Sequence, residues 1–244
     1  MLTQSSDIIH FTAISGIFVF KFWQYGEWIE VVVDDYLPIL NDELAFVKSN
    51  SPNEFWSALL EKAYAKLYGN YTLALNGGLI GSSMEDLSGG VAESYHDKSN
   101  PAPFKVMLKA YKQRSMIGAL IWTREGEQME QIDDIGLAGG HAYSVTKVVE
   151  FEIDDQKHQL VRVRNPWGND IEWKGAWSDD SEEWKALPGT KRFEIGLKKE
   201  DDGEFFMAYQ DFIKVPTSKV NTTKTSLNNC CFSTLMALTF AMSP

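Results

Sequence analysis

The chain has 244 residues, of which 44% are hydrophobic and 13% aromatic, and it carries a formal net charge of −11 at pH 7. This composition suits a packed globular protein and excludes a disordered or fibrous chain. The excess of negative charge opposes binding to nucleic acid or to anionic membrane surfaces, whereas clustered carboxylates can attract a cation such as calcium.

The N-terminal part of the sequence predicts a β-hairpin after an irregular start. Residues 1–16 follow no regular pattern, and we expect weak order there. Two strands, over residues 17–23 and 27–33, flank a turn at Tyr25-Gly26. The β-branched run Val31-Val32-Val33 favours burial of the second strand on both of its faces.

Two helices are predicted in the segment that follows. The first begins at Ser51 and ends near Leu67, and Glu54 lies at the spacing that completes a capping box with Ser51. A Gly/Ser-rich stretch over residues 76–90 predicts a loop and a possible domain seam. The second helix covers about residues 103–114, where apolar side chains recur at helical spacing.

The second half of the chain turns to β-structure. A strand over residues 119–122 is followed by an acidic loop over residues 125–134. Residues 142–153 and 159–164 predict the two strands of a hairpin. A further strand and a short helix are expected over residues 204–215.

Cysteine usage favours a reducing, cytoplasmic setting. The two cysteines, Cys230 and Cys231, are adjacent, and adjacent cysteines rarely pair, so no disulfide framework is expected. No Lys or Arg precedes Lys21, which argues against the basic start of a secretory signal. The apolar run over residues 230–242 is shorter than the roughly 20 residues that cross a bilayer, so no transmembrane segment is expected.

One histidine stands out from the other three. His141 follows Gly139-Gly140 and opens a buried-looking strand. Glycines at this position let the backbone approach a neighbouring chain closely, which suits an imidazole directed into a cleft. A structural histidine satisfied within the core is the alternative interpretation.

The opposite strand of the predicted hairpin ends in Asn165-Pro166-Trp167-Gly168. An Asn at this end can face His141, and its side-chain oxygen would then fix the tautomer and orientation of the imidazole. Trp167 could shield that hydrogen bond from water. A plain Asn-Pro turn is the alternative, but His, Asn and Trp together are also the base-and-orienter half of a cysteine-protease site.

The sequences Gly140–Val145 and Arg162–Gly168 resemble the calpain family of papain-like cysteine proteases. The similarity extends over about residues 16–216. Its further segments are Gly26-Glu27-Trp28, Val33-Asp34-Asp35, residues 53–67, Glu172-Trp173, Trp177-Ser178-Asp179 and residues 202–205. The resemblance implies that His141 is the catalytic base, that Asn165 orients it and that Trp167 shields both.

The resemblance implies an α+β, papain-like fold that is present only in part. Residues 17–115 correspond to a remnant of the first core subdomain with its linking helices, and residues 116–216 to the β-rich second subdomain. Residues 1–16 and the Ser/Thr/Asn-rich tail, residues 217–244, match nothing in the family.

The nucleophile of the family is missing from the matched residues. It lies in a Gly-Asp-Cys-Trp type segment at the start of a core helix, upstream of everything matched here, and residues 1–16 contain no such segment. Cys230 and Cys231 lack the helix N-terminus that lowers the pKa of a thiol, so we expect them to be inert. The chain therefore resembles a calpain core without its first third, and we expect it to be inactive by itself.

Residues 170–204 are rich in carboxylates, and their spacing alone fits a solvated acidic face. The ordered twelve-residue loop of an EF-hand is missing. The resemblance implies instead a calcium site, the second of the family core, with Glu200 providing only its backbone carbonyl. The side-chain ligands of that site would be Glu172, Asp179, Asp202 and Glu204.

Glu54 matches a ligand of the family's first core calcium site, although the other ligands of that site come from around the missing cysteine. Its capping-box role is therefore the safer interpretation.

Two function classes remain open. The first is a calcium-dependent endopeptidase domain that acts on protein substrates. The second is a non-catalytic calcium-binding or regulatory interaction fragment. The sequence identifies no regulatory subunit.

Overall fold

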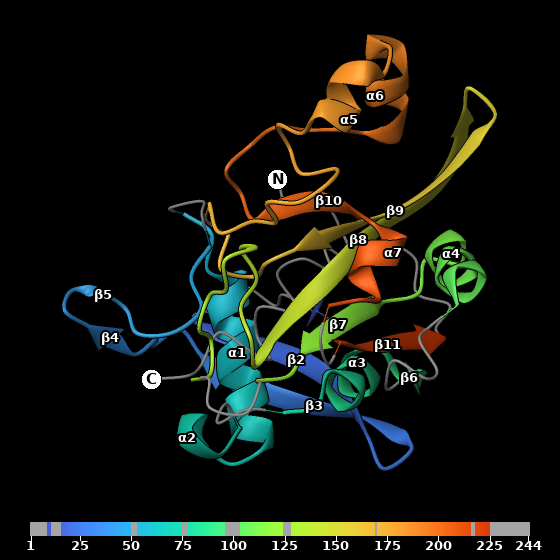
Figure 1. Cartoon of the computed structure of the whole chain (residues 1–244). Helices are drawn as coiled ribbons and strands as arrows, with labels where there is room; N and C mark the ends of the chain where they lie inside the picture. Colours follow the sequence, from blue (N-terminus) through green and yellow to red (C-terminus); the bar gives the residue numbers. More distant parts are fainter. Residues whose placement is uncertain are drawn as a thin grey trace. The chain divides into compact units, whose positions relative to one another are not determined.

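A computed structural model of the chain describes residues 9–10, 16–49, 53–74, 78–95, 103–123, 128–168, 170–215 and 218–224. The chain divides into two compact units, whose helices and strands are labelled in Figure 1. The first comprises Met1–Ala92 and Thr223–Pro244, and the second Glu93–Thr222. The predictions for most of residues 1–16 and for the tail after residue 224, with Cys230 and Cys231, lie outside the described residues.

The first unit contains the predicted N-terminal hairpin, in which Phe20 pairs with Val31 across two antiparallel strands. Tyr25 and Gly26 form its turn, and both have positive φ, at 52° and 88°. A two-residue turn of this kind matches the twist of the flanking strands. The strands of the unit are β1 (Ile9–His10), β2 (Ile17–Gln24), β3 (Glu27–Asp34), β4 (Ile39–Leu40) and β5 (Glu43–Leu44).

Strand β3 has one buried face, so the prediction of burial on both faces is wrong. Val31 and Val33 are buried, whereas Val32 between them is 45% exposed. The buried face shares a core with Phe20 and Phe22 of β2, and helix α1 (Trp56–Leu67) packs against both strands. Buried and exposed side chains alternate along β3 despite its β-branched residues, because helix α1 packs on one face of the hairpin.

Helix α1 begins later than predicted. Its N-cap is Phe55, which makes no side-chain capping bond, so the predicted capping box is wrong. Glu54 lies before the first turn and accepts a hydrogen bond from Ser49 Oγ at 2.6 Å. Ser51 lies outside the described residues.

A helix replaces the loop predicted over residues 76–90. Helix α3 (Ile80–Ser88) buries Ile80, Met84 and Leu87, which recur at helical spacing despite the small residues between them. It ends at Gly89 with φ at 65°, a usual helix stop. The short helix α2 (Tyr71–Ala74) precedes it.

Two carboxylates are buried in the first unit. Glu61 is 1% exposed, and its Oε2 accepts the Val47 N–H at 3.1 Å. Burial raises the pKa of Glu61 to about 7. Asp86 instead accepts hydrogen bonds from the hydroxyls of Tyr64 and Tyr68, at 2.9 and 2.5 Å. Burial raises the pKa of Asp86 as well, and these hydrogen bonds oppose part of that shift.

The second unit is built on a sheet with strand order β10-β9-β8-β7-β11-β6. Neighbouring strands from β10 to β11 in this order pair antiparallel. The predicted hairpin forms its centre, as β8 and β9. The strands are β6 (Val91–Tyr95), β7 (Ile117–Ile121), β8 (His141–Ile153), β9 (Gln156–Arg164), β10 (Glu204–Ala208) and β11 (Ser218–Lys224).

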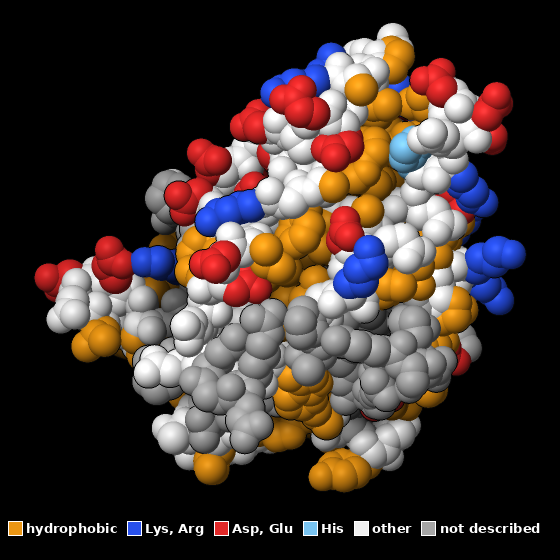
Figure 2. Space-filling view, viewed as in Figure 1, with side chains coloured by type: hydrophobic (Ala, Val, Ile, Leu, Met, Phe, Trp, Pro, Cys, Tyr) orange, Lys and Arg blue, Asp and Glu red, His pale blue; other side chains and the backbone are white. Residues whose placement is uncertain are grey.

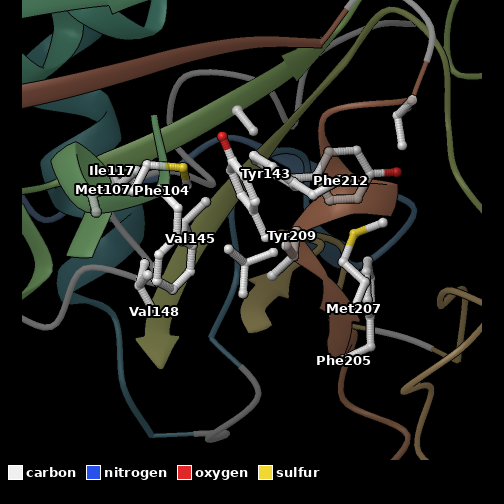
Figure 3. Packing of buried hydrophobic residues seen from close by; sticks show 14 of the residues in the cluster. Phe104, Met107, Ile117, Tyr143, Val145, Val148, Phe205, Met207, Tyr209 and Phe212 are labelled. Carbon is white, nitrogen blue, oxygen red and sulfur yellow. The ribbon is translucent and has the colours of Figure 1, made fainter. Parts of the chain in front are cut away.

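Helices α4 (Phe104–Lys112) and α7 (Tyr209–Phe212), both expected as helices from the sequence, pack on this sheet. Tyr143 of β8 lies at the centre of the core beneath them (Figure 3). Its hydroxyl accepts the Ala138 N–H at 2.8 Å, so the core also holds the loop that precedes β8. Core members shown with it are Phe104, Met107, Ile117, Val145, Val148, Phe205, Met207, Tyr209 and Phe212.

A smaller core holds the segment between β9 and β10. Trp184, from α5 (Glu182–Ala186), is fully buried and donates its indole N–H to the Trp177 carbonyl at 2.9 Å. Phe151 and Phe206 of the sheet pack in the same cluster, together with Ile195 of α6 (Gly189–Ile195). The acidic segment is therefore tied to the sheet by aromatic packing.

No helix in the described part of the chain is long and apolar enough to span a bilayer. The domain limits at residues 16, 115 and 216 refer to the family core and stay predictions.

Candidate active site

A glycine brings the candidate base into place. His141 is the first residue of β8 and pairs with Ile121 of β7. The preceding Gly140 has φ at 66°, and a Cβ there would lie 2.5 Å from Thr123 Oγ1. Glycine suits this position because its φ is in the left-handed region and it adds no Cβ beside this hydroxyl, in line with the close approach expected from the Gly-Gly-His sequence.

His141 and Asn165 meet across the hairpin. Their Nε2 and Oδ1 atoms are 3.0 Å apart, and both side chains are 0% exposed. Asn165 Oδ1 also accepts the Trp167 N–H at 3.1 Å. An amide oxygen only accepts, so Nε2 carries the hydrogen and Nδ1 is the ring atom left to exchange a proton.

Two aromatic rings enclose the imidazole. The Trp167 ring lies 4.5 Å from that of His141, centroid to centroid, at 40°. Tyr143 packs edge-on at 5.0 Å. The sequence predicts the position of Trp167 but not the role of Tyr143. The available signal was its spacing, since residues two apart on a strand share a face.

Within the described part of the chain, the buried Nδ1 atom of His141 has no hydrogen-bond partner, and neither has Asn165 Nδ2. The Glu130 carboxylate lies near it, with Oε1 3.5 Å from Nδ1. The candidate base therefore has one ring nitrogen that makes no hydrogen bond within the described residues. The alternative of a histidine fully satisfied within the core does not fit this geometry.

Three of the predicted calcium ligands lie in one acidic neighbourhood. Burial and the charges of Asp179 and Asp202 raise the pKa of Glu172 to about 7. Burial and the Asp180 charge raise the pKa of Asp179 to about 6, and its Oδ1 is buried without a hydrogen-bond partner. Carboxylates crowded in this way repel one another when ionised, and a bound cation would relieve that repulsion.

Two of the predicted ligands, Glu204 and Asp202, also contact basic side chains. Glu204 Oε1 accepts the Thr146 hydroxyl at 2.6 Å and lies 3.3 Å from Arg162 Nε. Asp202 lies 3.4 Å from Arg164 Nη1. As arranged, no three His, Cys, Asp or Glu of the described residues could hold a metal ion. Acidic side chains mixed with basic ones gather over the region of α5 and α6 in Figure 2.

One peptide links the acidic neighbourhood to the base. Gly203 donates its N–H to Glu172 Oε1 at 2.9 Å, and its carbonyl accepts the Asn165 N–H at 2.8 Å. Its φ is 79°, in the left-handed region. Sequence reasoning gives Gly203 no role, although the Asp-Gly-Glu motif around it points to a tight turn.

Comparisons with known proteins show which family the chain resembles. The family model described as "Calpain family cysteine protease" matches residues 3–221. Calpain-B of Drosophila melanogaster is 50% identical over 204 residues, which cover 82% of this chain and 22% of that protein.

Two further relatives are similarly close. Human Calpain-9 is 48% identical over 199 residues, covering 81% of this chain and 29% of its own length. Calpain clp-1 of Caenorhabditis elegans is 44% identical over 202 residues, covering 82% and 26%. The chain thus spans less than a third of each of these relatives. The α+β, papain-like fold expected from the sequence is confirmed, and the chain belongs to the calpain family of cysteine proteases.

Proposed function

We propose that this chain provides the base-bearing part of a calpain-type cysteine endopeptidase. The observation that carries the proposal is the buried His141–Asn165 pair with an unpartnered Nδ1. In such an enzyme Nδ1 takes the proton of a cysteine thiol, and the thiolate attacks the carbonyl carbon of a peptide bond. The imidazolium then returns the proton to the leaving amine, while Asn165 holds the ring in place.

The nucleophile has to come from outside the described residues, because residues 16–224 contain no cysteine. We therefore propose that this 244-residue chain does not cleave peptide bonds by itself. Protein substrates follow from the family. The cytoplasmic setting and the lack of nucleic acid partners remain predictions from cysteine content and charge.

The test is to join the chain behind the Cys-bearing segment of an active calpain and to measure cleavage of a fluorogenic peptide with calcium. We expect activity in the joined protein, none in the chain alone, and none in the joined His141→Ala variant. The exposed Glu152→Gln variant serves as a matched control. Activity that survives His141→Ala, or activity of the chain alone that is lost in Cys230→Ala, would overturn the proposal.

We further propose that Glu172, Asp179 and Asp202 hold calcium, together with Glu204 and the Glu200 carbonyl. The raised pKa values of Glu172 and Asp179 and the unpartnered Asp179 Oδ1 support this. When bound, calcium supplies the positive charge that the crowded carboxylates lack.

Two of these side chains have to change partners in this proposal. Glu204 would leave Arg162, and Asp202 would leave Arg164. Glu54 stays a predicted ligand of a separate site whose other ligands lie outside the described residues.

A non-catalytic calcium-binding fragment is the second candidate, favoured by the lack of a cysteine in residues 16–224. Calcium binding by calorimetry, together with an inactive joined protein, would favour it over the endopeptidase.

A further inference from the structure

A second polar group faces the candidate base. Glu130 Oε1 lies 3.5 Å from His141 Nδ1, on the nitrogen that Asn165 leaves unused. The Glu130 side chain is 24% exposed, whereas the imidazole is fully buried. The carboxylate is therefore within ion-pair distance of the reactive nitrogen but makes no hydrogen bond to it.

The loop that carries Glu130 is fixed by backbone contacts. The Glu130 N–H donates to the Gly139 carbonyl at 2.7 Å, and the Gly139 N–H donates to the Gln131 carbonyl at 3.1 Å. Glu130 itself has φ at 60°, which is uncommon for a residue with a side chain. A strained residue held by its surroundings in this way is typical of functional sites.

The same loop packs tightly against the next segment. A Cβ on Gly136 would lie 1.9 Å from the Glu172 carbonyl oxygen, and the Lys174 N–H donates to the Ile135 carbonyl at 3.0 Å. Tyr143 holds the loop from beneath through Ala138. These contacts keep the carboxylate beside the ring.

The carboxylate distinguishes the two charge states of the ring. In the neutral tautomer, with hydrogen on Nε2, the Nδ1 lone pair faces a negative charge, and the two repel. In the imidazolium, the Nδ1–H faces the same charge and is attracted. The other contacts of the ring, Asn165, Tyr143 and Trp167, are neutral.

The neighbouring charged groups act on other partners. The Asp133 charge acts on the Tyr143 hydroxyl, whose pKa burial raises above its usual range. Arg164 of β9 pairs with Asp202. Among the described residues, Glu130 is the carboxylate that lies within ion-pair distance of the imidazole.

We propose that Glu130 is a positioning residue for the base, which favours the imidazolium form of His141 and keeps Nδ1 directed at the incoming thiol. Its use in catalysis rests on the proposed function. The proton still passes from the thiol to Nδ1, and Glu130 neither takes nor gives it. The carboxylate acts through charge alone.

The proposal is tested on the 244-residue chain by 15N NMR of the histidine side chains, because the nitrogen shifts report protonation and tautomer. His141→Gln identifies the His141 signals. In Glu130→Gln, we expect the ratio of imidazolium to neutral His141 at a given pH to fall about tenfold. Glu130→Asp, which keeps the charge, should restore most of it, and Glu152→Gln should change nothing.

A change of less than about twofold in Glu130→Gln would overturn the proposal, as would an equal change in Glu152→Gln. If Glu130→Gln fails to fold, Glu130→Ala takes its place, since a charge effect predicts the same fall of the ratio, whereas a ratio within about twofold of the wild type contradicts the proposal. The measurement needs no nucleophile. A negative result would therefore contradict the role of Glu130 alone. The role of His141 is tested separately, by the activity of the joined protein.

Discussion

The hydrogen bond between His141 Nε2 and Asn165 Oδ1 selects the reactive nitrogen of the candidate base. Both partners could be predicted from the sequence, because Gly-Gly-His opens one strand of a hairpin and Asn-Pro-Trp ends the other. Glu130 and Gly203 could not, because they reach the site through loops whose path follows no periodicity.

Removal of the orienting amide should lower stability as well as activity. Asn165→Ala leaves the buried His141 Nε2–H and the Trp167 N–H without their acceptor. We expect a loss of about 1–3 kcal/mol in the free energy of unfolding, measured with urea. Asn165→Asp keeps oxygen acceptors and should lose less. Equal stability of Asn165→Ala and the wild type would contradict the geometry.

Glu61 should make the first unit less stable as the pH rises. Its pKa is raised by burial from 4.5 to about 7, so the folded state binds the proton more tightly than the unfolded state. The contribution of protonated Glu61 to the free energy of unfolding is fully present below its unfolded pKa of 4.5. It is lost as the pH rises through about 7.

Glu61→Gln mimics the protonated side chain. We expect it to match the wild type near pH 4 and to be more stable by about 3 kcal/mol at pH 8, by urea unfolding at both values. Glu152→Gln, at an exposed site, is the control. A gain that is the same at both pH values would contradict this account.

At the scale of elements, periodicity predicted the structure better than composition did. The hairpins around residues 25–26 and 154–155 and helix α4 form as predicted, because their apolar residues alternate or recur on one face. Helix α3 was missed, because its small residues hid the apolar spacing of Ile80, Met84 and Leu87. Helix α1 begins at Trp56, because tertiary packing sets its start and not the Ser51–Glu54 motif.

The start of β8 depends on a single glycine. Gly140→Ala places a Cβ 2.5 Å from Thr123 Oγ1 at a φ of 66°. We expect a loss of about 2 kcal/mol or more in unfolding free energy. Gly26→Ala is the matched control, because its φ is 88° but no atom lies within 4 Å of the added Cβ. It should cost about 1 kcal/mol, from backbone strain alone.

Thr123→Ala in the Gly140→Ala background should recover part of the loss, since it removes the hydroxyl that the new methyl group meets. Equal losses in Gly140→Ala and Gly26→Ala would mean that the close approach at His141 has no energetic role.

At the scale of the whole molecule, carboxylates with raised pKa values should make both stability and calcium binding depend on pH. Glu61, Glu172 and Asp179 all have raised pKa values, to about 7, 7 and 6. Without calcium, the melting temperature should fall as the pH rises from 5 to 8, because these groups lose protons that the folded state binds more tightly.

Calcium should reverse part of this fall. Glu172 and Asp179 have to be deprotonated to bind it, so millimolar calcium should raise the melting temperature more at pH 8 than at pH 5. The double variant Glu172→Gln and Asp179→Asn should lose this shift. A calcium shift that is equal at both pH values, or that survives in the double variant, would count against the site.

The central claim is that His141 is a base positioned for a thiol, and the pH dependence of thiol alkylation tests it most directly. In the joined protein, the rate of iodoacetamide reaction with the nucleophilic cysteine is measured from pH 5 to 9, with and without His141→Gln. The account predicts fast alkylation already near pH 6 with His141, because the imidazolium stabilises the thiolate, and a rise only near the free thiol pKa of about 8.5 in the variant. Identical profiles in the two proteins would contradict it.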